Sequence, residues 1–154
     1  MKSVTHNRVE VMHGVNFDIL GSRDREIYGG STLPELEVKI KGFARDLGLE
    51  AAFFQTNHEG VFVEHLHRLP EIADAVILNP GAWTHYSWAI RDGLDFTGVP
   101  AVEVHISDIS KREEWRKISV FEGLDQLIGR VYGKGVDGYR EALETIAEHL
   151  GSPD

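Results

Sequence analysis

Two residues of types that carry protons, Glu103 and His105, lie two positions apart in the run Val102-Glu103-Val104-His105-Ile106. Residues two apart on a strand point to the same face, so the carboxylate and the imidazole would lie side by side. A carboxylate in that position fixes the tautomer of the imidazole and raises its basicity. The pair indicates an oriented imidazole that can transfer protons; the alternative is a solvated glutamate beside a packed histidine.

A guanidinium and a phenol form a second candidate pair. Arg23 and Tyr28 lie five positions apart in residues 17–31, an aperiodic segment with Gly29-Gly30 near its end. A cation held against a phenol favours the phenolate, which is a base. Long aperiodic segments are often functional, and the two glycines favour a lid that closes over a site. An ordinary surface pair is the alternative.

Further polar side chains follow the ends of successive apolar runs. Asn16 follows the first run, Asn79 and His85 follow the central run, and Arg112 and Arg116 follow the fourth. If these runs are parallel strands, their carboxyl ends meet at one edge of the sheet, which is where ligands bind in open α/β sheets. The sequence therefore predicts a polar ligand site at that edge.

Several other chemistries lack the residues that they need. The chain has no cysteine, which excludes thiolate chemistry, disulfides and cysteine-ligated metal. It has no G-x-S-x-G elbow and no P-loop, so triad and nucleotide hydrolysis have no support. The lysines lie on predicted tails, helices or a turn, where nothing favours the neutral amine of a Schiff base. We therefore expect no covalent imine.

Two motifs have simpler structural explanations. Gly133-Lys134-Gly135-Val136-Asp137-Gly138 fits G-x-G-x-x-G, but no βαβ unit with an acidic residue about 20 positions later follows it in the sequence. A tight turn is the better interpretation. His58 and His65 would share a helical face while His67 points elsewhere, which favours partly exposed helix histidines over a zinc site.

Composition bounds the class of protein. With 154 residues, 42% hydrophobic and 27% charged, we expect one globular domain over residues 1–154, with residues 1–7 as a disordered tail. The net charge of −9 argues against nucleic acid or an anionic membrane as the partner. No apolar run approaches the roughly 20 residues of a membrane span, and no signal peptide is evident. These features predict a cytoplasmic protein.

The hydrophobic pattern alternates between strands and helices. Strands are predicted at residues 9–12, 51–55, 75–78, 101–106 and 127–132. Helices are predicted from Thr32 to Gly48, at 61–69 closed by Pro70, at 87–96, at 111–117 and at 139–150. This order predicts an α/β fold with a parallel sheet covered by helices on both faces.

Five blocks of sequence occur in order: Asn16-x-x-x-Leu20-Gly21-x-Arg23-x-x-x-Ile27-Tyr28-Gly29; Gln55-Thr56-Asn57-His58-Glu59-Gly60; Asn79-Pro80-Gly81-Ala82-x-Thr84-His85-x-Ser87-x-Ala89-x-Arg91-Asp92; Val102 to Ser107 with Arg112 to Arg116; and Gly133-x-Gly135-x-x-Gly138-Tyr139.

Together these blocks resemble the type II 3-dehydroquinate dehydratases from about residue 9 to residue 143. The resemblance implies a flavodoxin-like three-layer sandwich with a five-stranded parallel sheet, and a homo-oligomer, a dodecamer built from trimers. It implies anti elimination of water from 3-dehydroquinate, a small-molecule carboxylate, through an enolate without metal or organic cofactor.

The resemblance also implies a catalytic role for five residues. Tyr28 would be the base, and Arg23 would hold it as phenolate. His105, oriented by Glu103, would be the acid that protonates the leaving hydroxyl. Asn16 would help to hold a water that stabilises the enolate oxygen.

By the same resemblance, seven further residues would bind the substrate. Asn79 and the backbone of Ile106 and Ser107 would hold its carboxylate. The other binding residues would be His85 and Arg116 on ring hydroxyls, Arg112 on the lid side, and Asp92 from a neighbouring subunit.

The chain departs from the family pattern around the predicted site. His13 and Val15 stand where the family usually has asparagine and proline, and Asp108 and Ser110 stand where it usually has asparagine and histidine. A related dehydratase acting on another cyclic hydroxy-keto acid is therefore an alternative. A catalytically silent small-molecule binder is a second, although it would not need both an acid and a base. A flavoprotein is a third, but no phosphate-cradling loop follows the first strand.

Overall fold

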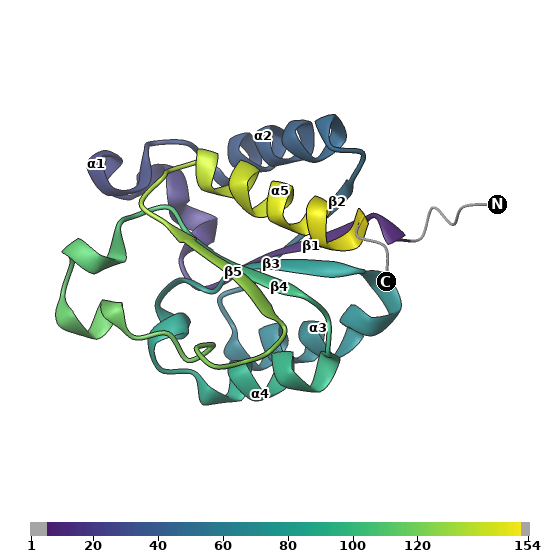
Figure 1. Cartoon of the computed structure of the whole chain (residues 1–154). Coiled ribbons are helices and arrows are strands. Elements are labelled where there is room, and N and C mark those ends of the chain that lie inside the picture. Colours follow the sequence, from purple (N-terminus) through teal and green to yellow (C-terminus); the bar gives the residue numbers. More distant parts are fainter. Residues whose placement is uncertain (1–5, 152–154) are drawn as a thin grey trace.

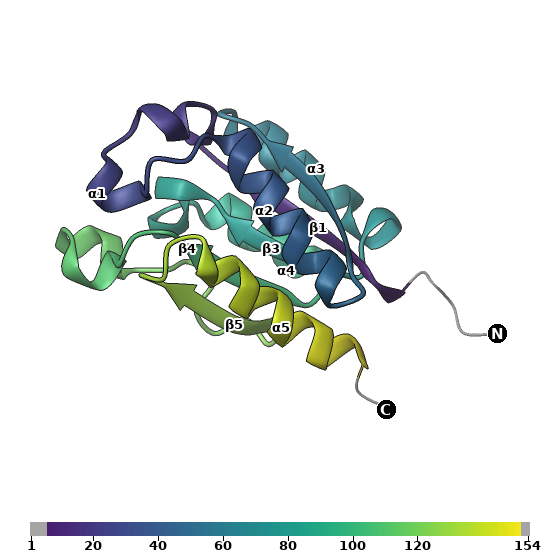
Figure 2. The same cartoon turned by 90° about the horizontal axis from the view of Figure 1, so that it is seen from above.

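A parallel sheet of five strands forms the centre of the computed structural model, which describes residues 6–151 (Figures 1 and 2). Its spatial order is β2-β1-β3-β4-β5. The strands are β1 (Arg8–His13), β2 (Glu50–Gln55), β3 (Ala75–Asn79), β4 (Ala101–His105) and β5 (Leu127–Tyr132), and every adjacent pair is parallel. This is the flavodoxin-like order, as predicted.

Two helices cover each face of the sheet. In Figure 1, α2 (Leu33–Asp46) and α5 (Asp137–Gly151) lie above it, and α3 (Glu59–Ile72) and α4 (Trp88–Thr97) lie below. The fully buried side chains divide in the same way. Those of α2 and α5 pack on one face, and those of α3 and α4 pack on the other: Leu36, Ile40, Leu143 and Ile146; Phe62, Leu66, Ile90 and Leu94.

Local signals fix the ends of these helices. The hydroxyl of Thr32 accepts a hydrogen bond from the backbone N–H of Glu35, whose carboxylate accepts one from the N–H of Thr32, which is the expected capping box. Ser87 caps α4 by accepting from the N–H of Ile90 at 3.1 Å. The chain leaves α4 at Gly98, whose φ of 63° suits glycine.

Three predicted elements differ in the structure. Pro70 lies inside α3 and does not close it. It removes one hydrogen bond of the last turn, and the helix continues only to Ile72. The helix predicted at 111–117 is wrong: two 3-10 turns, Ile109–Lys111 and Glu114–Lys117, flank an extended Arg112. The segment predicted as a loop contains a 3-10 turn, Phe17–Ser22, and the short helix α1 (Arg25–Tyr28).

The predicted amino-terminal tail is described only from residue 6, and its last residue is hydrogen-bonded to the rest of the fold. Residues 1–5 of the predicted tail lie outside the described residues, but Asn7 is hydrogen-bonded, through its side chain to the Gly48 carbonyl and through its own carbonyl to the N–H of Glu50. Between residues 6 and 151, no helix is long and apolar enough to cross a membrane.

The chain leaves β1 and β3 through two loops that touch. His13 and Asn79 are paired at the ends of these adjacent strands. A Cβ on Gly14 would lie 2.2 Å from the Pro80 oxygen, and a Cβ on Gly81 would lie 2.8 Å from the Val15 oxygen. Only glycine fits at such an approach. β1 and β3 are also the point where the strand order reverses, so the crevice between the loops is the expected ligand site.

Candidate active site

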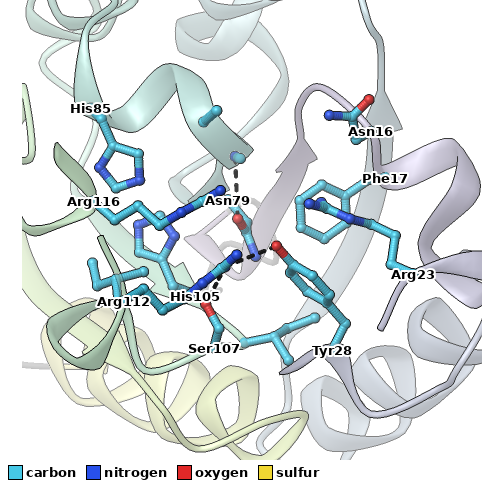
Figure 3. A pocket seen from close by; sticks show the side chains of 14 residues that line it. Asn16, Phe17, Arg23, Tyr28, Asn79, His85, His105, Ser107, Arg112 and Arg116 are labelled. Atoms are coloured by element: carbon cyan, nitrogen blue, oxygen red, sulfur yellow. Dashed lines mark hydrogen bonds between the residues drawn. The ribbon is translucent and has the colours of Figure 1, made fainter. Parts of the chain in front are cut away.

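A cavity opens at the carboxyl ends of β1, β3 and β4, beneath the segment that carries α1 (Figure 3). Ten of the twelve predicted site residues line it: Asn16, Arg23, Tyr28, Asn79, His85, His105, Ile106, Ser107, Arg112 and Arg116. Of the other two, Glu103 is buried behind His105, and Asp92 is exposed on α4 away from the cavity. Four further lining residues were not among the predicted site residues, although Gly81 and Ala82 lie in the sequence block that begins at Asn79: Phe17, Gly81, Ala82 and Ile109.

The phenol of Tyr28 is held by two guanidinium groups. The Cζ of Arg23 lies 4.0 Å from the centre of the Tyr28 ring, which is the predicted contact. The hydrogen bond to the phenol oxygen comes from elsewhere, since Nη1 of Arg112 donates to it at 2.9 Å. The same Nη1 lies 3.3 Å from the Ser107 hydroxyl. Two guanidinium groups from separate parts of the chain therefore contact this one phenol.

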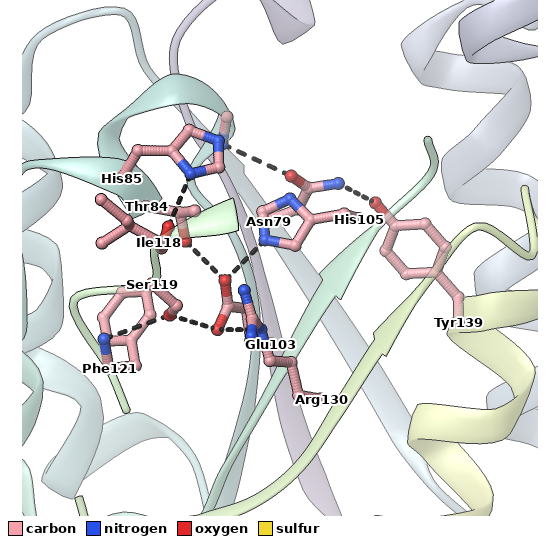
Figure 4. A network of polar contacts seen from close by, with 11 residues as sticks. Asn79, Thr84, His85, Glu103, His105, Ile118, Ser119, Phe121, Arg130 and Tyr139 are labelled. Atoms are coloured by element: carbon pink, nitrogen blue, oxygen red, sulfur yellow. Dashed lines mark hydrogen bonds and ion pairs between the residues drawn. The ribbon is translucent and has the colours of Figure 1, made fainter. Parts of the chain in front are cut away.

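The carboxylate of Glu103 is fully buried and surrounded by donors (Figure 4). Its Oε2 accepts from His105 Nε2 at 2.6 Å and from the Thr84 hydroxyl at 2.7 Å. Its Oε1 accepts from the Ser119 hydroxyl at 2.7 Å and lies 3.3 Å from Nε of Arg130. The predicted contact between Glu103 and His105 is therefore present, inside a network that the sequence did not reveal.

These partners keep Glu103 ionised. Burial alone would raise its pKa, but the hydrogen bond and charge of His105, the charge of Arg130 and the hydrogen bond of Ser119 together hold the pKa below its usual value. An ionised carboxylate can only accept, so Nε2 of His105 must carry its proton. Nδ1 is then the ring nitrogen available to a molecule in the cavity.

His85 is oriented by a backbone carbonyl. Its Nδ1 lies 2.7 Å from the Ile118 oxygen, which can only accept, so Nδ1 carries the proton. Burial lowers the pKa of His85; the Ile118 carbonyl opposes this, and the charges of His105 and Arg116 lower it further. The neutral ring therefore presents an unprotonated Nε2 that can accept a hydrogen bond from a hydroxyl.

The side chain of Asn79 is held in place by a buried pair of residues, Tyr139 and His13. Its Nδ2 donates to the Tyr139 hydroxyl at 3.0 Å, and that hydroxyl lies 2.9 Å from Nε2 of His13. Burial lowers the pKa of His13 to about 3 and raises the pKa of Tyr139. Both side chains are therefore neutral, and they hold the amide of Asn79 in one orientation at the floor of the cavity.

The lining is positively charged. It contains Arg23, Arg112 and Arg116 and no aspartate or glutamate. Arg116 is held by its Nε, which donates to Glu113 at 2.9 Å. Three guanidinium groups in one crevice create a local positive potential in a chain whose net charge is −9, which suits an anionic ligand.

Asp108 and Ser110, two of the residues that depart from the family pattern, do not line this cavity. Asp108 accepts from the N–H of Ser110 at 3.1 Å and from its hydroxyl at 2.5 Å, and lies 3.8 Å from the ammonium of Lys111. The hydrogen bond from Ser110 is the main reason that the pKa of Asp108 is lowered. The carboxylate of Asp108 is thus paired within its own turn, by Ser110 and Lys111.

The three histidines weighed above as a zinc site, at positions 58, 65 and 67, do not form a metal site. His58 and His67 are exposed, whereas His65 is buried, 2.7 Å from Glu10 and stacked on Phe54. The prediction that all three are partly exposed is wrong for His65, because a buried carboxylate on β1 pairs with it. In residues 6–151, no three histidine, aspartate or glutamate side chains could hold a metal ion together.

Comparisons with known proteins agree with this geometry. Residues 7–147 match the family model described as dehydroquinase class II. A 3-dehydroquinate dehydratase of Pelotomaculum thermopropionicum is 44% identical over 94% of this chain and 99% of that protein, and one of Thermotoga maritima is 46% identical over 93% and 96%. The crystal structure of type II dehydroquinase from Butyrivibrio crossotus superimposes with a TM-score of 0.86 and 36% identity, covering 92% of this chain and 97% of that one. The chain belongs to the class II dehydroquinase family.

Proposed function

We propose that this protein removes water from 3-dehydroquinate to give 3-dehydroshikimate through an enolate, with Tyr28 as base and His105 as acid. One observation carries the proposal: both side chains line one cavity, and each contacts a charged partner there. Arg112 and Arg23 contact the phenol, and Glu103 contacts the imidazole. A charged partner behind each group is what a base and an acid at one site need.

The enzyme class rests on relatives that cover nearly the whole chain. Those of 44–46% identity reported above are named 3-dehydroquinate dehydratases. The protein is accordingly a hydro-lyase of this type. Of the altered positions that favour another substrate, Ser110 lies outside the cavity lining, whereas Asp108 lines an adjoining pocket that shares Tyr28, Ser107 and Arg112 with the cavity. A related cyclic hydroxy-keto acid is therefore the second candidate substrate.

The reaction proceeds in two proton transfers. Tyr28 as phenolate takes a proton from the carbon next to the ketone, and the C–H electron pair moves into an enolate. As the enolate re-forms the ketone, its C=C electron pair shifts to form the new C=C bond of the product and the bond to the hydroxyl breaks. His105, as imidazolium, gives its Nδ1 proton to that hydroxyl, which leaves as water. Tyr28 then returns its proton to solvent and His105 takes one up. Asn16 helps to hold a water on the enolate oxygen.

The remaining lining residues bind the substrate. Asn79, with its amide fixed by Tyr139, and the backbone of Ile106 and Ser107 hold the carboxylate. His85 accepts from a ring hydroxyl through Nε2, and Arg116 donates to another. The positive lining draws the anionic substrate into the crevice.

Asp92 enters the site of a neighbouring subunit in this proposal. It lies between Trp88 and Phe96 on one exposed face of α4, since residues four apart share a face. The two aromatic side chains are 62% and 70% exposed, which is unusual unless another surface covers them. We propose a homo-oligomer, a dodecamer built from trimers, in which this face is buried.

The direct test is to incubate purified protein with 3-dehydroquinate and follow the conjugated-enone absorbance of the product. We expect enone formation by the wild type and none by the double variant Tyr28→Phe/His105→Ala. Folded wild-type protein that forms no enone would refute the proposal.

A further inference from the structure

A cationic side chain, Arg130, lies beside the Glu103 carboxylate that orients His105. Arg130 of β5 is paired in register with Glu103 of β4, and its Nε lies 3.3 Å from Oε1. Figure 4 shows the carboxylate between the imidazole of His105 and the guanidinium of Arg130. Glu103 is fully buried, and the Arg130 side chain is three-quarters buried. The two cationic groups therefore share one desolvated anion.

Arg130 acts on this carboxylate through its charge and not through a directed hydrogen bond. Its Nε and Nη2 are shielded from solvent and have no hydrogen-bond partner in the described part of the chain, so the N–H of Nε is not aimed at the oxygen 3.3 Å away. The position of the carboxylate is instead fixed by the Thr84 and Ser119 hydroxyls and by His105. A charge at this distance in a buried site is little screened by solvent ions.

A carboxylate that already interacts with one cation attracts a second cation less strongly. We propose that Arg130 is a positioning residue that shares the Glu103 carboxylate with His105, weakens the hold of that carboxylate on the imidazolium, and so makes His105 a readier proton donor. This inference rests on the proposed function, in which His105 is the acid. It adds a residue of β5 to a site otherwise built from the ends of β1, β3 and β4.

Other charged or titratable groups also lie near His105. His85, from the segment after β3, stacks on it with ring centres 6.1 Å apart. Arg116, from the turn Glu114–Lys117, lines the same cavity, and Arg112 and Tyr28 lie on it as well. In residues 6–151, however, Arg130 is the only arginine or lysine within ion-pair distance of Glu103. Its charge also contributes to the lowered pKa of Glu103.

The test compares the pH dependence of kcat/KM for the wild type, Arg130→Gln and Arg130→Lys. The alkaline limb of the profile reports loss of the protonated acid. Without the cation, the whole carboxylate charge stabilises the imidazolium, so Arg130→Gln should move this limb to higher pH by on the order of one unit. Arg130→Lys keeps the charge and should leave the limb in place. Arg45→Gln, an exposed arginine on α2, controls for net charge and should not move it.

A second measurement needs no turnover. Titration of the His105 imidazole C–H by NMR, assigned by its absence in His105→Ala, should show a midpoint that rises in Arg130→Gln but not in Arg130→Lys. Because substrate is absent, this result separates a failure of the inference from a failure of the proposed function. If Arg130→Gln does not fold, Arg130→Met takes its place, since it is also neutral and keeps an unbranched side chain. An unmoved midpoint in the neutral variant, or an equal rise in Arg130→Lys, would overturn the inference.

Discussion

Nη1 of Arg112 donates a hydrogen bond to the phenol oxygen of Tyr28 at 2.9 Å, across 84 residues of chain. Arg23, which is only five residues from Tyr28, lies instead over the face of the ring. The two guanidinium groups therefore contact the phenol in different ways, one through a directed hydrogen bond to its oxygen and the other over the π face of its ring. Arg112 is extended between two 3-10 turns, and this conformation allows its side chain to reach α1.

This contact predicts that Arg112 and Tyr28 act as a unit. Arg112→Met should lower kcat by at least about tenfold, because the developing base loses its hydrogen-bond donor. In the Tyr28→Phe background the same change should cost little more, since the phenol oxygen is already absent. Arg116→Met removes an equal charge from the lining without a contact to Tyr28 and should mainly raise KM. Additive losses in the double variant would contradict the coupling.

The acid and the base should each be indispensable for turnover. Tyr28→Phe should lower kcat by about a hundredfold or more and leave substrate binding nearly unchanged, as for loss of a general base. His105→Ala should cause comparable damage. Tyr132→Phe and His67→Ala change residues of the same types outside the cavity and should retain wild-type rates. Wild-type turnover by Tyr28→Phe would show that another group takes the proton.

The cavity lining predicts chemistry without an imine. No lysine is among the lining residues in the described part of the chain. Borohydride added during turnover should therefore neither inactivate the protein nor add the mass of a reduced substrate adduct, measured by intact mass spectrometry. A single reduced adduct on any lysine would exclude the enolate route proposed above.

Most of the fold could be predicted from the sequence, because its signals are local. The capping box at Thr32 and Glu35 begins α2 as predicted, and the apolar run at 127–132 coincides with β5. The predictions failed where the same local sequence signal is compatible with more than one structure. Pro70 is tolerated in the last turn of α3, and the charged segment after β4 folds into two short turns instead of one helix.

The candidate site was predictable only in part, for a similar reason. Glu103 and His105 are neighbours on one strand, so their contact follows from strand geometry alone. The contact of Arg130 with Glu103 depends on the register of β5 against β4, which includes an irregularity at Ala101 and Val102. The support of Asn79 by Tyr139 and His13 joins residues of three elements. Sequence spacing carries no information about such contacts.

The exposed face of α4 leads to a prediction about assembly. Asp92→Ala should weaken substrate binding, measured as a higher KM, if this carboxylate completes the site of a neighbouring subunit. Trp88→Glu should dissociate the assembly and lower activity, because it places a charge in a buried apolar contact. Asp95→Ala, an exposed acidic residue on the same helix, is the matched control. Light scattering that shows a fully active monomer would refute the shared site.

The buried His13 makes stability depend on pH in a definite direction. Burial lowers its folded-state pKa from 6.5 to about 3, so the unfolded chain binds a proton more readily than the folded one between these values. The free energy of unfolding contributed by this group is therefore fully present above pH 6.5 and falls as the pH drops towards 3, by up to about 1.4 kcal/mol per pH unit.

Replacing His13 should flatten this dependence. Urea unfolding of the wild type and of His13→Asn, at one protein concentration and at several pH values between 4 and 7.5, should give a smaller slope for the variant. Carboxylates with lowered pKa values, such as Glu103 and Asp74, also destabilise the fold in acid, but they are common to both proteins and cancel in the difference. His67→Asn, an exposed histidine, should keep the wild-type slope. Equal slopes for the wild type and His13→Asn would mean that His13 becomes protonated within the folded protein, in conflict with its burial beside Tyr139.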